Sequence, residues 1–88
     1  MIIEEVTIVN KVGLHARPAA KLVRLTAKYK ANVNLTYGEN TINAKSIMGV
    51  MMLAVEQGGI LKLTVEGEDE KELMAALIDL IKSGFGEE

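Results

Sequence analysis

The sequence predicts an α+β fold: an open-faced two-layer sandwich with three helices on one face of a four-stranded antiparallel sheet. Four segments have the composition or alternation of strands and three have the periodicity of helices, in the order β-α-β-β-α-β-α. A tight turn at Gly38 and the alternation of the last strand favour antiparallel pairing. A chain of 88 residues has room for one small core, so we expect one domain spanning residues 1–88.

The first third of the chain predicts a strand, a break and a helix. Residues 2–9 are rich in β-branched side chains and are typical of a strand. Polar residues and Gly13 interrupt this run. Residues from 16 to about 30 suit a helix, and their apolar positions have a spacing consistent with one buried face: Ala19, Leu22, Val23 and Ala27.

The middle of the chain predicts a hairpin followed by a short helix. Residues 32–37 alternate, with Val33, Leu35 and Tyr37 on one side. Residues 38–40 have turn chemistry, and residues 41–44 return as a short partner strand. Ser46 has the position and side chain of an N-cap for a helix over residues 47–53.

The last third predicts a strand and a longer helix. Two glycines, 58 and 59, form a break, and residues 60–67 alternate as a half-buried strand does. Asp69 with Glu72 has the spacing of an acidic capping box. The apolar positions of the helix that follows are helically spaced, and Gly84 stops it: Leu73, Met74, Leu77, Ile78 and Ile81. The final residues, GFGEE, match no motif that we assign.

Composition excludes several classes of protein. The chain has no cysteine and one histidine, so it offers no disulfide, no thiolate nucleophile and no protein-only zinc site. No apolar run approaches the roughly 20 residues that a membrane-spanning helix needs, and the acidic N-terminal stretch is unlike a signal peptide. We therefore expect a cytoplasmic protein without metal, cofactor or membrane insertion.

The net charge of −2 conceals a separation of charge along the chain. From residue 11 to 45 there are seven basic residues and one acid, whereas the remaining segments hold three basic residues and eleven acids. This predicts one positive side, suited to a protein with an acidic patch. Four of these cations share one face of the first predicted helix: Arg17, Lys21, Arg24 and Lys28. With three aromatic residues and no stacking platform, RNA binding is the weaker alternative.

The stretch GLHARPAA, residues 13–20, has the composition of a helix start that receives an anion. Pro18 lacks an N–H and fits only the first turn of a helix, which places His15 at or just before the start. The amides of Ala16 and Arg17 then point outward at the positive end of the helix. A phosphoryl group on His15 would meet those amides and the Arg17 guanidinium. The alternative is an ordinary surface or packing histidine.

The short helix after Ser46 is too apolar to bury only one side. Ile47, Val50, Met51 and Ala54 form one stripe, and Met48, Met52 and Val55 form another. We expect one stripe to be exposed beside His15, as an adaptable surface for several partners. The alternative is a fully buried helix.

Two motifs resemble the HPr family, the histidine-containing phosphocarriers of the bacterial phosphoenolpyruvate-dependent sugar phosphotransferase system. GLHARPAA resembles the active-site motif of the family, and AKSIMGVMML, residues 44–53, resembles its second motif. The resemblance extends over essentially all of the chain. It implies that His15 is phosphorylated on Nδ1, that Arg17 steadies the phosphoryl group, and that Enzyme I is the donor and the IIA domains of sugar transporters are the acceptors. It implies a carrier rather than an enzyme, and we expect a monomer.

The second motif resembles the Gram-positive form of the family, in which this serine is phosphorylated by a dedicated kinase. By that resemblance Ser46 is a regulatory site, and its phosphorylated form is a corepressor for a catabolite-control transcription factor. A serine kinase/phosphorylase and that factor are thus implied partners. The resemblance and the basic face together predict the docking residues: Ala20, Lys21, Arg24, Ile47, Met48 and Met51.

The sequence departs from the family pattern at one position, and two other interpretations of its function remain. Val12 lies where family members more often carry a small polar residue near the helix start. A nitrogen-branch or regulatory paralogue is the nearer rival, and the presence of both His15 and Ser46 favours the sugar-system form. A small ligand-binding or nucleic-acid-binding α+β domain that uses its basic helix is the rival from another class.

Overall fold

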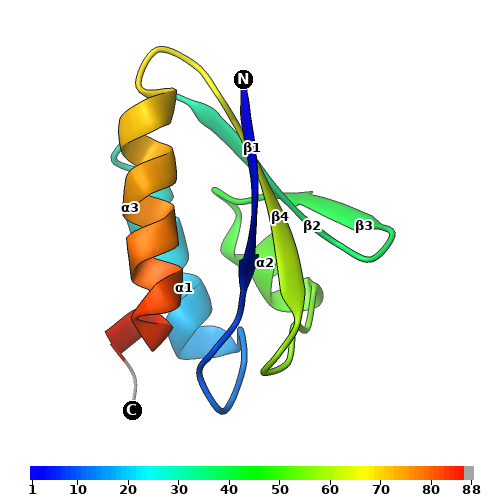
Figure 1. The fold of residues 1–88 in the computed structure, drawn as a ribbon. Coiled ribbons are helices and arrows are strands. Elements are labelled where there is room, and N and C mark those ends of the chain that lie inside the picture. The colour runs from blue at the N-terminus through cyan, green and yellow to red at the C-terminus, as the bar shows by residue number, and fades with distance from the viewer. Residues whose placement is uncertain (87–88) are drawn as a thin grey trace.

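The predicted fold is confirmed in a computed structural model, which describes residues 1–86. Four antiparallel strands form an open sheet, and three helices complete the order β-α-β-β-α-β-α (Figure 1). The elements are β1 (Ile2–Thr7), α1 (Ala16–Thr26), β2 (Asn32–Tyr37), β3 (Asn40–Asn43), α2 (Ile47–Met52), β4 (Ile60–Glu66), α3 (Glu70–Lys82) and a 3₁₀ turn, η1 (Gly84–Gly86).

The sheet has the strand order β1-β4-β2-β3, with every neighbouring pair antiparallel. In the register, Leu63 of the central strand β4 pairs with Glu4 of β1 on one side and Leu35 of β2 on the other. Strand side chains alternate between the two faces of a sheet. In β4, Leu61, Leu63 and Val65 are therefore buried, whereas the alternating positions are exposed or, at Thr64, half-buried. The buried side of the sheet therefore meets the helices.

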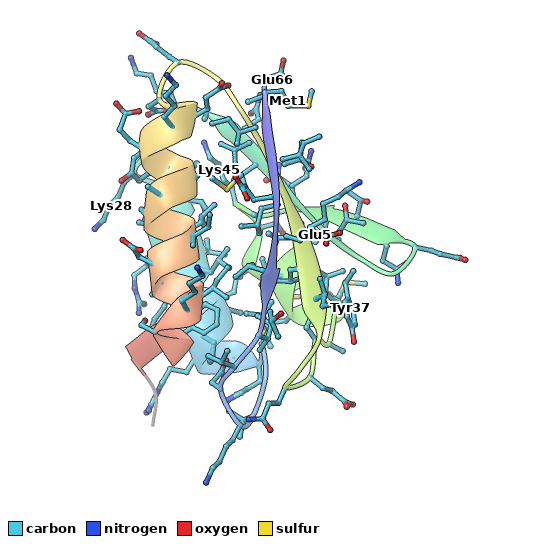
Figure 2. The ribbon with its side chains drawn as sticks, in the orientation of Figure 1. Met1, Glu5, Lys28, Tyr37, Lys45 and Glu66 are labelled. Atoms are coloured by element: carbon cyan, nitrogen blue, oxygen red, sulfur yellow. The ribbon has the colours of Figure 1, made fainter. Side chains whose placement is uncertain are left out.

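The helices α1 and α3 run antiparallel and side by side over the sheet (Figure 1). Leu22 of α1 and Leu73, Leu77 and Ile81 of α3 are fully buried in the core. In Figure 2, Glu5 projects from the side of the sheet that faces away from α3, and Lys28 projects beyond the helical layer. In α3 the predicted apolar face is largely buried. In α1 the prediction is correct for Ala19 and Leu22, but Val23 is only half-buried, and Ala27, beyond the end of the helix, is exposed.

The helix α1 ends at Thr26, earlier than the predicted end near Lys30. The Thr26 side chain is fully buried, and its hydroxyl donates to the Ala44 carbonyl oxygen at 2.9 Å. The amides of Lys28 and Tyr29 then bond three residues back instead of four, which tightens the chain into a turn. Residues 27–30 have adequate helix propensity, yet the helix ends at Thr26, where the side chain contacts the β3–α2 loop.

The predicted capping box of Asp69 and Glu72 is wrong. Asp69 occupies the N-cap position of α3, but its side chain makes no capping hydrogen bond. Its carboxylate instead accepts from the backbone amides of Lys30 at 2.9 Å and Ala31 at 2.8 Å. The Lys30 amide above all, together with that of Ala31, holds the pKa of Asp69 below its ordinary value of 3.8. Asp69 therefore ties α3 to the loop between α1 and β2.

The C-terminal GFG segment, which the sequence left without a role, completes the core. Phe85 is buried with a relative exposure of 1%, between flanking glycines of positive φ. Its carbonyl oxygen accepts a hydrogen bond from Lys21 Nζ at 2.7 Å, which joins η1 to α1. Glu87 and Glu88, the end of the GFGEE stretch, lie outside the described residues.

Candidate functional site

His15 is the N-cap residue of α1, and its backbone is extended with φ −97° and ψ −158°. Its imidazole is exposed and makes no capping hydrogen bond. The first helical hydrogen bond runs from the Ala19 amide to the His15 carbonyl oxygen at 2.8 Å. Pro18 is the third residue of α1, inside the first turn, where its missing N–H costs no helical bond. The positive end of the helix is thus presented next to an accessible imidazole.

The loop before His15 is held by backbone contacts. Gly13 has φ +71°, and a Cβ on it would collide with the Val55 carbonyl oxygen and lie 2.9 Å from Glu56 Cα. The adjacent Leu14 amide donates to that same Val55 oxygen at 2.8 Å. Asn10 Nδ2 donates to the Gly13 carbonyl oxygen at 2.6 Å from a largely buried position. Only glycine suits this close approach and this conformation together.

These contacts join the start of α1 to the segment that follows α2. His15, Val12, Met51 and Glu56 line one shallow depression, so the two regions share a continuous surface. Ala54, in the same depression, has φ +53°, which is uncommon for a residue other than glycine. His15 therefore lies beside α2, as the sequence predicts.

Ser46 is the N-cap of α2, and its side chain makes the capping hydrogen bond of that helix. Its Oγ accepts a hydrogen bond from the Gly49 amide at 3.2 Å, and its side chain is exposed. The Val50 amide continues the helix by bonding to the Ser46 carbonyl oxygen at 3.0 Å. The N-cap that the sequence predicts is therefore present.

The helix α2 exposes most of its apolar side chains, so the fully buried alternative is wrong. The relative exposures are 41% for Ile47, 68% for Met48, 41% for Met51 and 76% for Met52. The predicted division into two stripes is also wrong, because Val50 of the first stripe and Val55 of the second are both buried. With Val50 as the only buried residue inside α2, the helix rests on a narrow line and presents a broad apolar surface.

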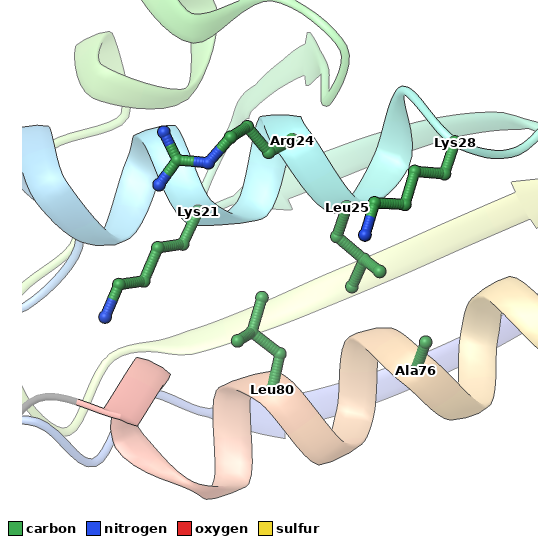
Figure 3. Close-up of a pocket in the computed structure, with 6 residues that line it drawn as sticks. All are labelled: Lys21, Arg24, Leu25, Lys28, Ala76 and Leu80. Atoms are coloured by element: carbon green, nitrogen blue, oxygen red, sulfur yellow. The ribbon is translucent and has the colours of Figure 1, made fainter.

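The cations of the predicted basic face are not equivalent: three are exposed to solvent and one also makes a structural hydrogen bond. Arg17 and Arg24 are exposed, and so is Lys28, which lies beyond the end of α1. Lys21 is half-buried and reaches toward η1, where its ammonium binds the Phe85 carbonyl oxygen (Figure 3). Arg24 and Lys28 border a groove between α1 and α3 whose floor is apolar: Leu25, Ala76 and Leu80. Lys21 thus contributes a structural contact as well as charge.

The geometry suits a group that is delivered by, and returned to, another macromolecule. The imidazole nitrogens of His15 lie on an exposed ring at a helix start, and the depression beside this ring is open. Within residues 1–86, no cluster of three or more histidine, cysteine, aspartate or glutamate side chains could hold a metal ion. Over the same residues no helix is both long and apolar enough to cross a membrane. An anion on His15 would face the first-turn amides of α1.

Sequence reasoning missed the residues that brace this site. Val55 was assigned only to an apolar stripe, because its hydrogen bond with Leu14, far earlier in the chain, leaves no local signal in the sequence. Asn10 looks like an ordinary strand breaker, yet it is buried and bonded to Gly13. Gly13 between two longer side chains was the one available hint of a special backbone conformation.

An exposed histidine at a helix start, beside an open depression on an α+β sandwich, is an arrangement that suits a group-carrier protein. The family model described as "PTS HPr component phosphorylation site" matches residues 2–83. The chain is 46% identical over 88 residues to a phosphocarrier protein HPr from Xylella fastidiosa strain Temecula1, covering 100% of this chain and 99% of that protein. The chain belongs to the HPr family and is a phosphocarrier of the phosphotransferase system, not an enzyme.

Solved structures agree with this assignment. HPr-C-His from Thermoanaerobacter tengcongensis superimposes with a TM-score of 0.95 at 49% identity, covering 100% of this chain and 99% of that one. A structure of an HPr dimer from the same organism gives a TM-score of 0.79 at 50% identity, covering 96% of this chain and 99% of that one. The resemblance carried by GLHARPAA and AKSIMGVMML is thereby confirmed at the level of the family.

Proposed function

We propose that His15 is the phosphoryl acceptor, through Nδ1, and that the protein carries the group from phosphorylated Enzyme I to the IIA domains of sugar transporters. When the protein is loaded, the N–P bond to His15 Nδ1 forms as the bond to Enzyme I breaks. When the group is delivered, that N–P bond breaks as the IIA domain accepts the phosphoryl group. The observation that carries the proposal is the exposed imidazole at the N-cap of α1, which makes no capping bond. Phosphorylation therefore displaces no hydrogen bond of the helix start.

Ala16 and Arg17 are proposed to stabilise the phosphoryl group. They are the first two residues of α1, so their backbone N–H groups lie in the turn where helices bind anions. The exposed Arg17 guanidinium adds a charge-assisted donor. Pro18 positions this turn by its restricted φ, as a residue of the first turn.

The docking surface for both partners is proposed to span α1 and α2, which pack against each other. Its apolar part comprises Ile47, Met48 and Met51, all exposed, together with the half-buried Ala20. Its basic part comprises Arg24 and Lys21, with the Lys21 ammonium also bound to Phe85. This combination suits acidic partners with an apolar centre, bound quickly and released quickly. We propose that the protein acts as a cytoplasmic monomer.

The direct test is phosphorylation by Enzyme I and phosphoenolpyruvate, followed by mass spectrometry. The protein should gain one phosphate that is labile in acid and stable in base. His15→Ala should abolish this gain and leave the unfolding temperature nearly unchanged, because the imidazole makes no structural bond. Arg17→Ala should be labelled more slowly at the same site. Undiminished labelling of the His15→Ala protein would refute the acceptor.

Ser46 is proposed to be a regulatory phosphorylation site, acted on by a serine kinase/phosphorylase, whose product binds a catabolite-control transcription factor. Ser46 is exposed, and it lies at the start of the helix that carries the docking methionines. A phosphate there adds negative charge next to a surface that is proposed to attract acidic partners. The expected consequence is slower transfer from Enzyme I.

Ser46→Asp tests the electrostatic part of this proposal. We expect slower phosphoryl transfer from Enzyme I than for the wild type, with a difference that shrinks as salt screens the charges. Ser46→Asn is the matched control, since asparagine is also a good N-cap and adds no charge. Equal rates for Ser46→Asp and Ser46→Asn, or a wild-type rate that is independent of salt, would contradict electrostatic docking.

A further inference from the structure

Three of the five methionines of the chain are exposed on the single short helix α2. Met52 is 76% exposed, Met48 68% and Met51 41%, whereas Met74 of α3 is 4% exposed. Met1, at 66%, is exposed at the N-terminus, away from α2. The chain therefore contains a clustered set of accessible thioethers, a buried reference and an exposed reference outside the cluster. We call Met48, Met51 and Met52 the α2 methionines.

The position of the cluster connects it to the acceptor. Met51 lines the same depression as His15. Met48 and Met51 also belong to the proposed docking surface, whose contacts depend on apolar, adaptable side chains. A change in the polarity of these side chains would therefore be felt where partners approach His15.

We infer that the α2 methionines are a site of reversible oxidation by peroxides, which lowers phosphoryl transfer by making the docking surface polar. In the reaction the methionine sulfur takes one oxygen atom from hydrogen peroxide. An S–O bond forms, the O–O bond breaks, the sulfur loses two electrons and the peroxide leaves as water. The sulfoxide is a polar, chiral group that methionine sulfoxide reductases return to the thioether. The effect on transfer rests on the proposed function; the oxidation itself does not.

The fold survives this modification because the α2 methionines are not what holds α2 in place. Val50 and Leu53 are the buried contacts of the helix and its C-cap, and Ser46 caps its start. Oxidation of Met74, by contrast, would place a sulfoxide inside the core. Loss of transfer with an intact fold is therefore the signature of the α2 methionines.

The first experiment maps the oxidation. The purified full chain is treated with hydrogen peroxide, and each methionine is followed by peptide mass spectrometry. We expect Met52, Met48 and Met51 to be oxidised much faster than Met74, with Met1 also reacting quickly. The circular dichroism melting curve should remain cooperative. Oxidation of Met74 at the same rate as the α2 methionines would overturn the inference, because it would show reaction through an unfolded state.

The second experiment measures phosphoryl transfer from Enzyme I before and after oxidation, each variant being compared with its own untreated sample. We expect roughly a tenfold loss for the wild type, since a polar group left unpaired in a contact is worth about a factor of ten in affinity. The loss should be reversed by a mixture of reductases for both sulfoxide epimers. A variant with Met48→Leu, Met51→Leu and Met52→Leu should keep its rate on peroxide treatment, because leucine is of similar size and has no sulfur to oxidise.

One further variant serves as a control. Met74→Leu should retain the full sensitivity of the wild type. A triple variant as sensitive as the wild type, or a fully oxidised α2 with unchanged transfer, would overturn the regulatory role. Absence of labelling on the untreated wild type would instead refute the proposed function, while the oxidation map from the first experiment would stand by itself.

Discussion

The starts of α1 and α2 are capped in opposite ways. At α1 the N-cap is His15, whose side chain makes no capping bond, and the turn is held by backbone contacts of Gly13 and Leu14 with Val55. At α2 the N-cap is Ser46, whose hydroxyl accepts from the Gly49 amide. The difference shows which of the two side chains can be modified without loss of a structural hydrogen bond. A group added to His15 removes no structural bond, whereas one added to Ser46 replaces a helix cap.

The two helices also differ in how they are anchored. The helix α1 has 11 residues and buries Pro18, Ala19, Leu22 and Thr26, whereas α2 has six residues and buries Val50 alone. Packing therefore stabilises α1 much more than α2, and α2 depends more on its cap. Three comparisons test this contrast and extend it to α3, from the largest expected effect to the smallest.

Gly13→Ala should have the largest effect, because it attacks the contact that holds the start of α1. The added Cβ would collide with the Val55 carbonyl oxygen and would also occupy φ +71°. We expect a loss of about 3 kcal/mol in the free energy of unfolding, measured by urea denaturation. Gly38→Ala is the matched control: its φ is +63°, but nothing lies within 4 Å of the new Cβ. It should cost about 1 kcal/mol, and equal losses in the two variants would contradict the role of the close approach.

Ser46→Ala compared with His15→Ala sharpens the contrast between the two N-caps. Removing the Ser46 hydroxyl leaves the Gly49 amide without its acceptor, so we expect a loss of about 1 kcal/mol. Removing the His15 imidazole breaks no capping bond, so the loss should stay below about 0.5 kcal/mol. Both are measured as free energies of unfolding in urea. A larger loss for His15→Ala than for Ser46→Ala would contradict the conclusion that Ser46 stabilises its helix start and the His15 imidazole does not.

Asp69→Asn extends the comparison to the third helix start and concerns pH. The folded-state pKa of Asp69 lies below its ordinary value of 3.8, chiefly because the Lys30 amide donates to the carboxylate. Its contribution to stability is therefore complete at neutral pH and is lost as pH falls through the folded-state pKa. The stability difference between wild type and Asp69→Asn should shrink on acidification below about pH 4. Thermal melts at a series of pH values measure it, and a constant difference would contradict the carboxylate's role.

The sequence was sufficient for features that depend on local patterns. Alternation in residues 60–67 placed Leu61, Leu63 and Val65 on the buried side of β4, and Pro18 placed the first turn of α1. The cap at Ser46 was also local, since serine preceding an apolar run is a strong N-cap signal. These features share one cause: the interacting groups are within a few residues of each other.

Features that depend on distant segments were not predictable in this way. Asp69 has the spacing of a capping residue, but two amides from the α1–β2 loop take its carboxylate. The exposed residues of α2 could not be assigned to one stripe, because both Val50 and Val55 are buried by packing that periodicity does not report. Phe85, in a segment with no motif, completes the core. In each case a partner remote in sequence decides the role of the residue.

The hydrogen bond from the Leu14 amide to the Val55 carbonyl oxygen has a kinetic consequence. It connects the turn that bears His15 to the segment that follows α2 and so restricts the movement of one relative to the other. A surface already in its final arrangement loses little conformational entropy when a partner arrives and regains little when the partner departs. Such a surface needs little rearrangement before each of its partners can bind, and slow exchange of the Leu14 amide with deuterated solvent would record how rarely this hydrogen bond opens.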